Sequence, residues 1–210
     1  MTPVYFEPNP PTPEHAPPPV RLVDDRRGTW GMTLFIIMEA LLFVMLIWAY
    51  YYVEKGNERW KVEIPPPLNY SLPMLGVIVL SSIVLYAGEK KVRQRSYGAG
   101  RIAVIVTIIL GLGFLYLGWR NFAEHSVHLK AQTDAYGSAF YTIIGTYMVH
   151  LIAGLLMLFW LLLLAKRWEP AQHSPHRPYH NTAMFWHFLA VLWFVIVAVL
   201  YIAPNILVNI

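Results

Sequence analysis

Five long apolar stretches constrain the fold of this chain more than any other feature. They cover about 30–53, 72–88, 101–120, 139–165 and 182–204. A membrane-spanning helix needs about 20 mostly apolar residues, and a backbone inside lipid must pair its polar groups as a helix or a closed barrel. Since these runs are long and continuous, they predict an all-α membrane protein, a bundle of five transmembrane helices.

The composition supports a membrane protein. The 210 residues are 57% hydrophobic and 13% charged, whereas soluble domains carry about a quarter charged residues. There are no cysteines, which excludes disulfides, thiolate metal sites and cysteine nucleophiles. No internal repeat is visible, so an inverted-repeat transporter is not favoured.

The chain divides into a tail, residues 1–28, and a membrane domain, residues 29–210. Eight of the sixteen prolines fall within the first nineteen residues. Such a segment lacks the apolar core of a signal peptide and favours an extended or disordered form. We expect a solvated tail; a docking arm against a partner subunit is the alternative.

The positions of the positive charges predict the orientation of the bundle. Inside-facing loops of membrane proteins are enriched in Lys and Arg. If the N-terminus lies inside, eleven of the sixteen Lys and Arg residues fall on inside segments and five on outside ones. This split predicts an N-in, C-out topology. Because the basic residues flank the membrane spans, a role in nucleic-acid binding is not expected.

Glu39 is the most unusual residue within a span. No basic residue lies within a turn or two of it on its own helix, and an ionised carboxylate facing lipid costs roughly 3 kcal/mol on insertion scales. Glu39 must therefore be protonated, paired with another helix, or close to a water path. A neutral interhelix hydrogen bond is the simplest interpretation. A proton-linked or lipid-contact role is the functional one.

Counting residues along the spans places several polar groups at the depth of Glu39. Ser81 and Ser82 on the second span and His150 on the fourth fall in the middle third of the bilayer. A buried network of glutamate, serine and histidine is therefore geometrically allowed, with partners that must come from other helices.

Two histidines within spans, His150 and His187, raise the possibility of haem ligation. Their predicted depths differ by about 15 Å at 1.5 Å per helical residue, so the two imidazoles are not expected to share one haem. A hydrogen-bonded packing role is the default expectation for both.

Histidines outside the predicted spans favour no metal site. His173, His176 and His180 have helix-like spacing, but Pro175 and Pro178 are expected to break any helix there, so we interpret 169–181 as a solvated loop. Glu124 lies beside two further histidines at the outer edge. A polar helix end is the preferred interpretation there, and a weak metal site is the alternative.

Five segments of the chain resemble, in order and spacing, subunit III of the haem–copper cytochrome c and quinol oxidases. The similarity extends over about 30–204. The segments are Trp30–Glu39, with the family's glutamate; Leu68–Tyr70 followed by Val79–Ser82; Asn121–His125; Gly137–Thr142 followed by Gly145 and His150; and Phe185–Trp193. The chain departs from the family pattern at Asn121, His125, Tyr147 and Ala190. Five helices rather than seven resemble the shorter bacterial form, which lacks the first two.

The resemblance implies a non-catalytic subunit of a terminal oxidase in the bacterial plasma membrane. Such a subunit packs on the catalytic subunit I, contacts phospholipids, and supports proton uptake and lasting turnover. It binds no haem or copper itself; these reside in the partner subunits. The buried glutamate of the family, matched by Glu39, is a carbodiimide-reactive type of site. Ser81, Ser82, Glu124, His150 and His187 are the other candidate polar, proton-linked or lipid-contact residues.

Two other functions stay open from the sequence. One is a subunit III-like accessory protein of a nitric oxide reductase. The other is a membrane anchor that binds haem b through His150 or His187.

Overall fold

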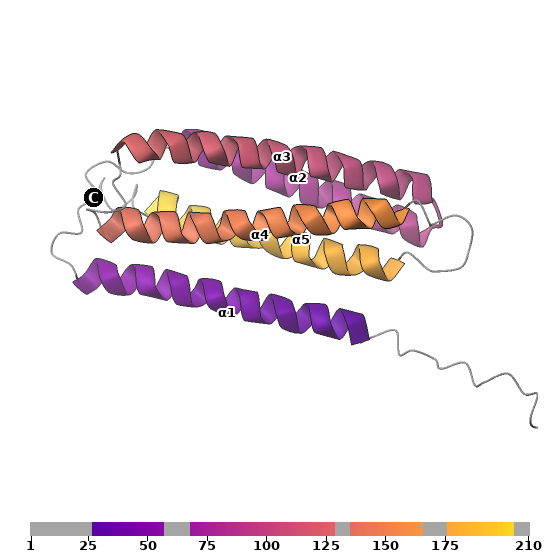
Figure 1. Cartoon of the computed structure of the whole chain (residues 1–210), viewed down its shortest axis with the longest axis horizontal. Helices are drawn as coiled ribbons and strands as arrows, with labels where there is room; N and C mark the ends of the chain where they lie inside the picture. Colours follow the sequence, from indigo (N-terminus) through magenta and orange to yellow (C-terminus); the bar gives the residue numbers. More distant parts are fainter. Residues whose placement is uncertain (1–26, 57–67, 129–134, 166–175, 204–210) are drawn as a thin grey trace, which may run out of the picture.

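The computed structural model describes residues 27–56, 68–128, 135–165 and 176–203, without the side chains of 68, 124–128 and 135. Five long helices fill these ranges and run side by side (Figure 1). They are α1 (Arg27–Gly56), α2 (Leu68–Arg93), α3 (Tyr97–His128), α4 (Ala135–Ala165) and α5 (His176–Val197), which the π-helical turn η2 (Ala198–Ile202) continues.

Each helix is long and apolar enough to cross a membrane. No strand occurs in the described ranges, so the predicted all-α bundle of five spanning helices is confirmed. The proposed tail, 1–28, lies outside the described residues except for its last two, which already belong to α1.

Several helices extend beyond the predicted apolar stretches, and at α5 the added residues include a proline. α5 begins at His176 and contains Pro178 as its third residue. The first N–H groups of a helix have no intrahelical partner, so a proline there costs no hydrogen bond. The prediction of a proline-broken loop over 169–181 is therefore wrong from residue 176 onward; 166–175 lie outside the described residues.

α2 also contains a proline close to its beginning. It begins at Leu68, four residues before the predicted start, and Pro73 is its sixth residue. A proline at that position removes one backbone hydrogen bond near the end of the helix. The proline therefore lies inside α2 and does not mark its first turn.

A tight turn joins α2 to α3. Ser96 N–H donates to the carbonyl of Lys91 at 2.9 Å, and Arg95 N–H donates to the carbonyl of Val92 at 3.0 Å. This pair of bonds is the Schellman arrangement, which requires a left-handed residue just past the helix end. Arg95 occupies that position with φ of 62°, where glycine is usual.

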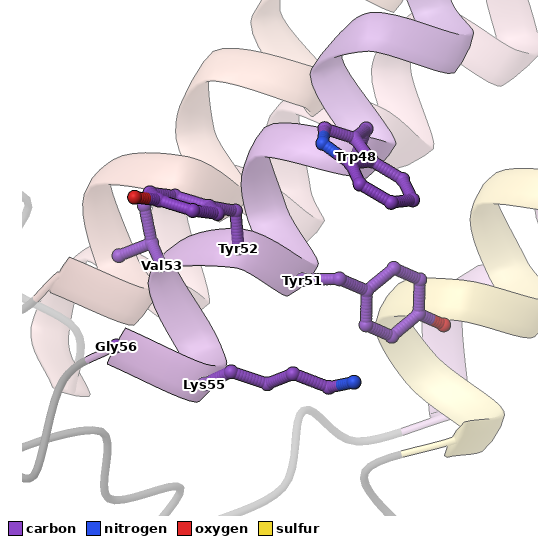
Figure 2. Close-up of a pocket in the computed structure, with 6 residues that line it drawn as sticks. All are labelled: Trp48, Tyr51, Tyr52, Val53, Lys55 and Gly56. Carbon is purple, nitrogen blue, oxygen red and sulfur yellow. The ribbon is translucent and has the colours of Figure 1, made fainter.

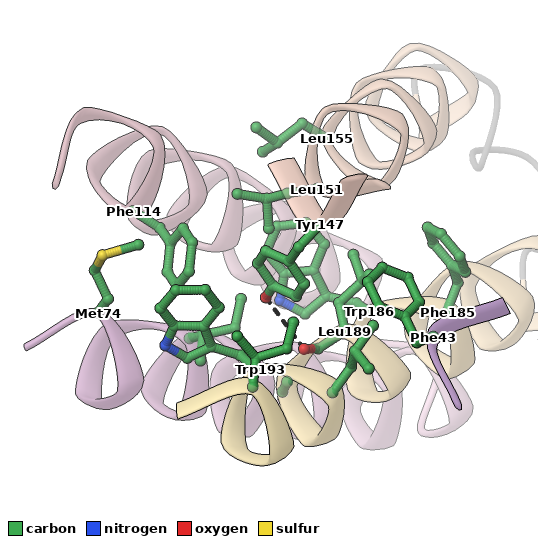
Figure 3. Packing of buried hydrophobic residues seen from close by; sticks show 14 of the residues in the cluster. Phe43, Met74, Phe114, Tyr147, Leu151, Leu155, Phe185, Trp186, Leu189 and Trp193 are labelled. Atoms are coloured by element: carbon green, nitrogen blue, oxygen red, sulfur yellow. Dashed lines mark hydrogen bonds between the residues drawn. The ribbon is translucent and has the colours of Figure 1, made fainter. Parts of the chain in front are cut away.

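The core lies around α5 and is aromatic at its centre (Figure 3). Trp193 packs edge-on against Phe114 of α3, with ring centroids 5.0 Å apart. It also packs in a tilted arrangement against Tyr147 of α4, with ring centroids 4.9 Å apart. The Tyr147 hydroxyl donates to the carbonyl of Leu189 at 3.1 Å. Three helices therefore meet through large, fully buried side chains.

Glycines permit the closest helix contacts. A Cβ added at Gly88 of α2 would lie 2.4 Å from the Cβ of Ala103 on α3 and 2.2 Å from the Tyr179 hydroxyl oxygen on α5. Gly111 and Gly118 of α3 are similarly confined, whereas a Cβ at Gly113 would meet nothing within 4 Å. Small residues let membrane helices approach closely, and this applies to Gly111 and Gly118 but not to Gly113.

α1 lies apart from the other four helices (Figure 1). Only 6% of its most apolar window is buried inside the chain, against 56% for α5. One narrow stripe makes its contacts: Phe35 reaches Phe185 of α5 with centroids 5.7 Å apart, Phe43 and Tyr50 are almost fully buried, and Glu39 lies on the same stripe, one turn before Phe43.

The two ends of the bundle differ in chemistry. We call the end where α1 and α5 begin the basic end; it carries Arg27, Lys90, Lys91, Arg93, Arg95, Arg101 and Arg177. At the opposite end of α1, aromatic side chains and Lys55 surround a hollow of about 700 Å³. Figure 2 shows Tyr51 and Lys55 extending in the same direction there. Such aromatic residues are typical of the membrane–water interface.

Candidate functional site

The carboxyl group of Glu39 pairs with a histidine of another helix. Glu39 Oε2 on α1 lies 2.6 Å from His150 Nε2 on α4. The two side chains are 17% and 15% exposed, respectively. Phe43, one turn along α1, packs edge-on against the His150 ring with centroids 5.3 Å apart. The pair therefore lies in an apolar setting where α1 meets α4.

The other nitrogen of His150 fixes where the protons can be. His150 Nδ1 lies 2.7 Å from the carbonyl oxygen of Thr146, one turn earlier in α4. Because a carbonyl only accepts, Nδ1 must carry a proton. One further proton then lies between Nε2 and the carboxyl group, either on Glu39 or on His150.

Both arrangements of that shared proton have zero net charge. A neutral carboxyl group can donate to a neutral imidazole, or a carboxylate can accept from an imidazolium. Adding or removing one proton leaves a net charge in surroundings of low polarity, where an unpaired charge is costly. The geometry therefore suits a group that holds one proton and can shift it between α1 and α4.

The two serines lie elsewhere. Ser81 on α2 accepts from the indole N–H of Trp186 at 2.9 Å and donates to the carbonyl of Ile78 at 2.8 Å. Ser82 Oγ lies 2.5 Å from His187 Nδ1. Adjacent residues of α2 thus bind adjacent residues of α5. The single network that the depth count allowed is not formed, and two separate groups take its place.

This difference arises from the direction in which each side chain faces around its helix axis. Residue counting gives the depth of a group in the membrane but not the direction in which it faces around its helix. Glu39 and His150 face each other across α1 and α4, whereas Ser81 and Ser82 face α5. The Glu124 side chain, the sixth candidate, lies outside the described side chains.

Haem ligation by His150 would require breaking an existing contact, since both of its ring nitrogens have partners. His187 has Nδ1 on Ser82, and its Nε2 is buried without a hydrogen-bond partner. Among the side chains that the structure describes, no group of three or more His, Asp or Glu is arranged to hold a metal ion.

Three residues at which the chain departs from the resemblance, Asn121, Tyr147 and Ala190, make contacts within the bundle; the side chain of the fourth, His125, lies outside the described side chains. The Tyr147 side chain is fully buried and its hydroxyl donates to the carbonyl of Leu189. Ala190 lies in the core and is 8% exposed. Asn121 Nδ2 donates to the Tyr201 hydroxyl at 2.7 Å and so ties α3 to η2.

A second buried acid was not predicted from the sequence. Glu89, near the end of α2, is 6% exposed. Its Oε1 accepts from Arg93 at 2.8 Å, lies 3.0 Å from His180 Nδ1, and lies 3.8 Å from His176 Nε2. His176 and His180 are four residues apart, a spacing that would place them on one face of a helix. The neighbouring prolines, however, predicted that no helix forms there.

Comparison with known proteins gives a consistent match. The sequence profile of the family described as Cytochrome c oxidase subunit III matches residues 23–204. A cytochrome c oxidase subunit 3 from Synechocystis sp. is 27% identical over 177 residues, which are 82% of this chain and 74% of that protein. Two others are from Allomyces macrogynus, 29% identical over 85% of this chain and 67% of that protein, and from Bacillus subtilis, 28% identical over 82% and 84%.

Proposed function

Because this chain belongs to the cytochrome c oxidase subunit III family, we propose that it works as a non-catalytic subunit of a haem–copper oxidase in the bacterial plasma membrane. It packs on the catalytic subunit and contacts membrane phospholipids. Haem and copper belong to the partner subunits, and this chain supports proton uptake and lasting turnover.

The Glu39–His150 pair is the observation that carries this proposal. It joins the loosely packed α1 to α4 within the apolar part of the bundle and holds one shared proton. A group of this kind supports proton uptake in two ways. It can exchange its proton, and it can hold α1 in register against the rest of the bundle.

Replacing Glu39 with Gln separates these two roles. The amide N–H₂ can still donate to His150 Nε2, so the interhelix bond is kept while the titratable proton is lost. We expect the Glu39→Gln oxidase to assemble normally, to take up protons more slowly and to lose activity sooner during turnover. Glu54→Gln, on the same helix, is the matched control and should behave as wild type.

The measurements are co-purification with the catalytic subunit, initial proton uptake in vesicles, and the number of turnovers before activity decays. Normal assembly with wild-type uptake and lifetime in Glu39→Gln would reduce the pair to a packing contact. Failure of the wild-type chain to co-purify with a haem–copper subunit would contradict the proposed function itself.

A further inference from the structure

A second hollow opens at the basic end, where α1 and α5 both begin (Figure 1). Three of its lining residues belong to α1 and three to α5, so it separates the two helices there. Its volume is about 480 Å³, within the range of roughly 300–1,000 Å³ that holds a drug-sized molecule, and a few amino-acid residues are of that size. The lining residues are Thr29, Trp30, Thr33, His176, Arg177 and His180.

The charge of this lining favours an acidic occupant. Arg177 is a permanent cation, the two histidines can add positive charge, and none of the six described lining residues is acidic. Glu89 lies behind the histidines, 3.0 Å from His180 Nδ1, but it also pairs with Arg93 at 2.8 Å. The negative charge of Glu89 is therefore already offset by Arg93, and the hollow itself carries a net positive charge.

Hydrogen-bond acceptors at the edge of the hollow favour a peptide over a simple anion. Asn181 follows His180, and a Cβ added at Gly28 of α1 would lie 3.5 Å from its Nδ2. Asn181 Oδ1 is buried and has no hydrogen-bond partner among the residues that the structure describes. The Thr33 hydroxyl donates to the Thr29 carbonyl at 2.9 Å, so its oxygen can still accept. A simple anion offers only acceptors, whereas a peptide segment also brings backbone N–H donors.

The chain itself carries a segment of matching chemistry directly before α1. Residues 22–25, Leu-Val-Asp-Asp, lie outside the described ranges, and we call them the acidic segment. Its two aspartates are the only acidic residues between Glu14 and Glu39. Its leucine and valine match the Trp30 indole, which is 66% exposed beside the hollow. The segment therefore offers carboxylates for the cations, apolar side chains for the indole and N–H groups for the acceptors.

The position of the acidic segment in the chain places it within reach of the hollow. It ends two residues before Arg27, where α1 begins, and a chain spans about 3.3–3.6 Å per residue. Thr33 lies six residues into α1, about 9 Å along the helix at 1.5 Å per residue. Four residues that turn back beside α1 therefore cover the α1 side of the hollow. A short tether gives an effective concentration on the order of millimolar, so weak contacts are enough to hold the segment.

We propose that the acidic segment folds back into this hollow and fastens the beginning of α1 to the beginning of α5. Its aspartates bind Arg177, and its leucine and valine pack between Trp30 and Thr33. α1 gains a second attachment in this way, in addition to its narrow stripe, since only 6% of its most apolar window is buried inside the chain. The contact is distinct from the Glu39–His150 pair and does not depend on the proposed function.

Disulfide trapping tests the fold-back in the oxidase complex in native membranes. The chain has no cysteine, so Val23→Cys and Thr33→Cys together introduce its only two thiols. A disulfide needs Cα atoms closer than about 7 Å, whereas a continued helix would place residues 23 and 33 about 15 Å apart and an extended chain would place them farther. After mild oxidation and denaturation, a maleimide-linked polyethylene glycol shows by gel shift how many thiols of this subunit stay free.

Gly31→Cys in place of Thr33→Cys is the matched control. Gly31 is exposed and nearer to position 23 in the sequence, and a Cβ there would meet nothing within 4 Å. Two residues along a helix turn it about 200° away from Thr33, so it does not line the hollow. A freely moving tail would form the Gly31 disulfide at least as fast, whereas we expect the Thr33 disulfide to form severalfold faster.

Charge variants test how the segment is held. Asp24→Asn combined with Asp25→Asn removes both carboxylates but keeps side chains that cap a helix equally well. We expect this pair of changes, and separately Arg177→Gln, to slow the Thr33 disulfide about fivefold, the upper end for an exposed ion pair. Combining them should slow it no further, because both remove the same contact. Glu14→Gln, which removes an acid of the tail outside the segment, is the control and should leave the rate unchanged.

Equal rates for the Thr33 and Gly31 pairs would show a freely moving tail and would overturn the proposal. If both pairs stay reduced, the segment does not enter the hollow, and the proposal fails in that case as well. A fast Thr33 disulfide that the charge variants do not slow, or losses that add in the combined variant, would overturn Arg177 as the partner of the aspartates. None of these results bears on the proposed function, which depends on co-purification with a haem–copper subunit.

Discussion

Glu39 shows how a single polar atom constrains its surroundings. A carboxyl group in the middle of a span needs a partner, and the partner is His150, whose other nitrogen is held by the Thr146 carbonyl. Each contact limits the next, because the carbonyl fixes the tautomer and the tautomer limits where the remaining proton can lie. The position of the shared proton therefore depends on a backbone carbonyl as well as on the two side chains.

A double-mutant cycle tests the energetic side of this pair. Glu39→Leu alone leaves the partly buried His150 Nε2 without its partner, and we expect it to lower the free energy of unfolding by about 1–3 kcal/mol. Glu39→Leu combined with His150→Phe should recover most of that loss, because no polar atom is then left unpaired. Denaturation of the purified full chain in mixed micelles, followed by far-ultraviolet circular dichroism, measures both values. Additive losses in the double variant would contradict a direct pair.

Between helices, glycines and prolines have their effect through position. Pro178 in the first turn of α5 leaves the helix intact, and this lets His176 and His180 share a face directed at Glu89. Gly88 of α2 lies where α3 and α5 approach it most closely, whereas a Cβ added at Gly76 on the same helix would meet nothing within 4 Å. The same residue type therefore has different consequences at the two positions.

Alanine at these two glycines gives a matched comparison. Gly88→Ala must displace Tyr179 or separate α2 from α3, so we expect a loss of about 1–3 kcal/mol of unfolding free energy, the usual range for overpacking. Gly76→Ala should be neutral or stabilising by up to about 1 kcal/mol, since alanine favours the helix. The same micelle denaturation compares them. Equal effects at the two positions would mean that the α2–α3 contact is looser than the structure shows.

The whole molecule is a compact group of four helices with α1 attached along one stripe. The distribution of charge is also asymmetric, since seven Lys and Arg residues of the described ranges lie at the basic end. The topology rule for membrane proteins places such an end inside the cell. The N-in, C-out orientation stays a prediction from charge.

The absence of native cysteines makes that orientation directly testable. Thr12→Cys in the tail and Thr133→Cys between the third and fourth helices each introduce a single thiol. With a membrane-impermeant maleimide added to intact cells, we expect labelling at position 133 and none at position 12 until the membrane is opened. The opposite pattern would reverse the topology.

Much of the fold can be predicted from the sequence because lipid strongly constrains local backbone structure. Backbone groups in an apolar medium must pair within their own helix, so length and hydropathy are enough to predict five spans. Residue counting also predicted that Glu39 and His150 lie at a similar level, as their contact requires, since the rise per residue in a helix is constant.

The site depended on information that is not local. Which face of one helix meets which face of another is set by side-chain packing between distant segments, and this packing paired Glu39 with His150 while directing Ser81 and Ser82 to α5. The Glu89 cluster was hidden for the same reason, together with two prolines that looked like helix breakers. The apolar pattern of the chain thus determined the number of its helices and the level of each residue along its helix. The rotation of the helices against one another depends on packing between distant segments, and this rotation decided which polar groups meet.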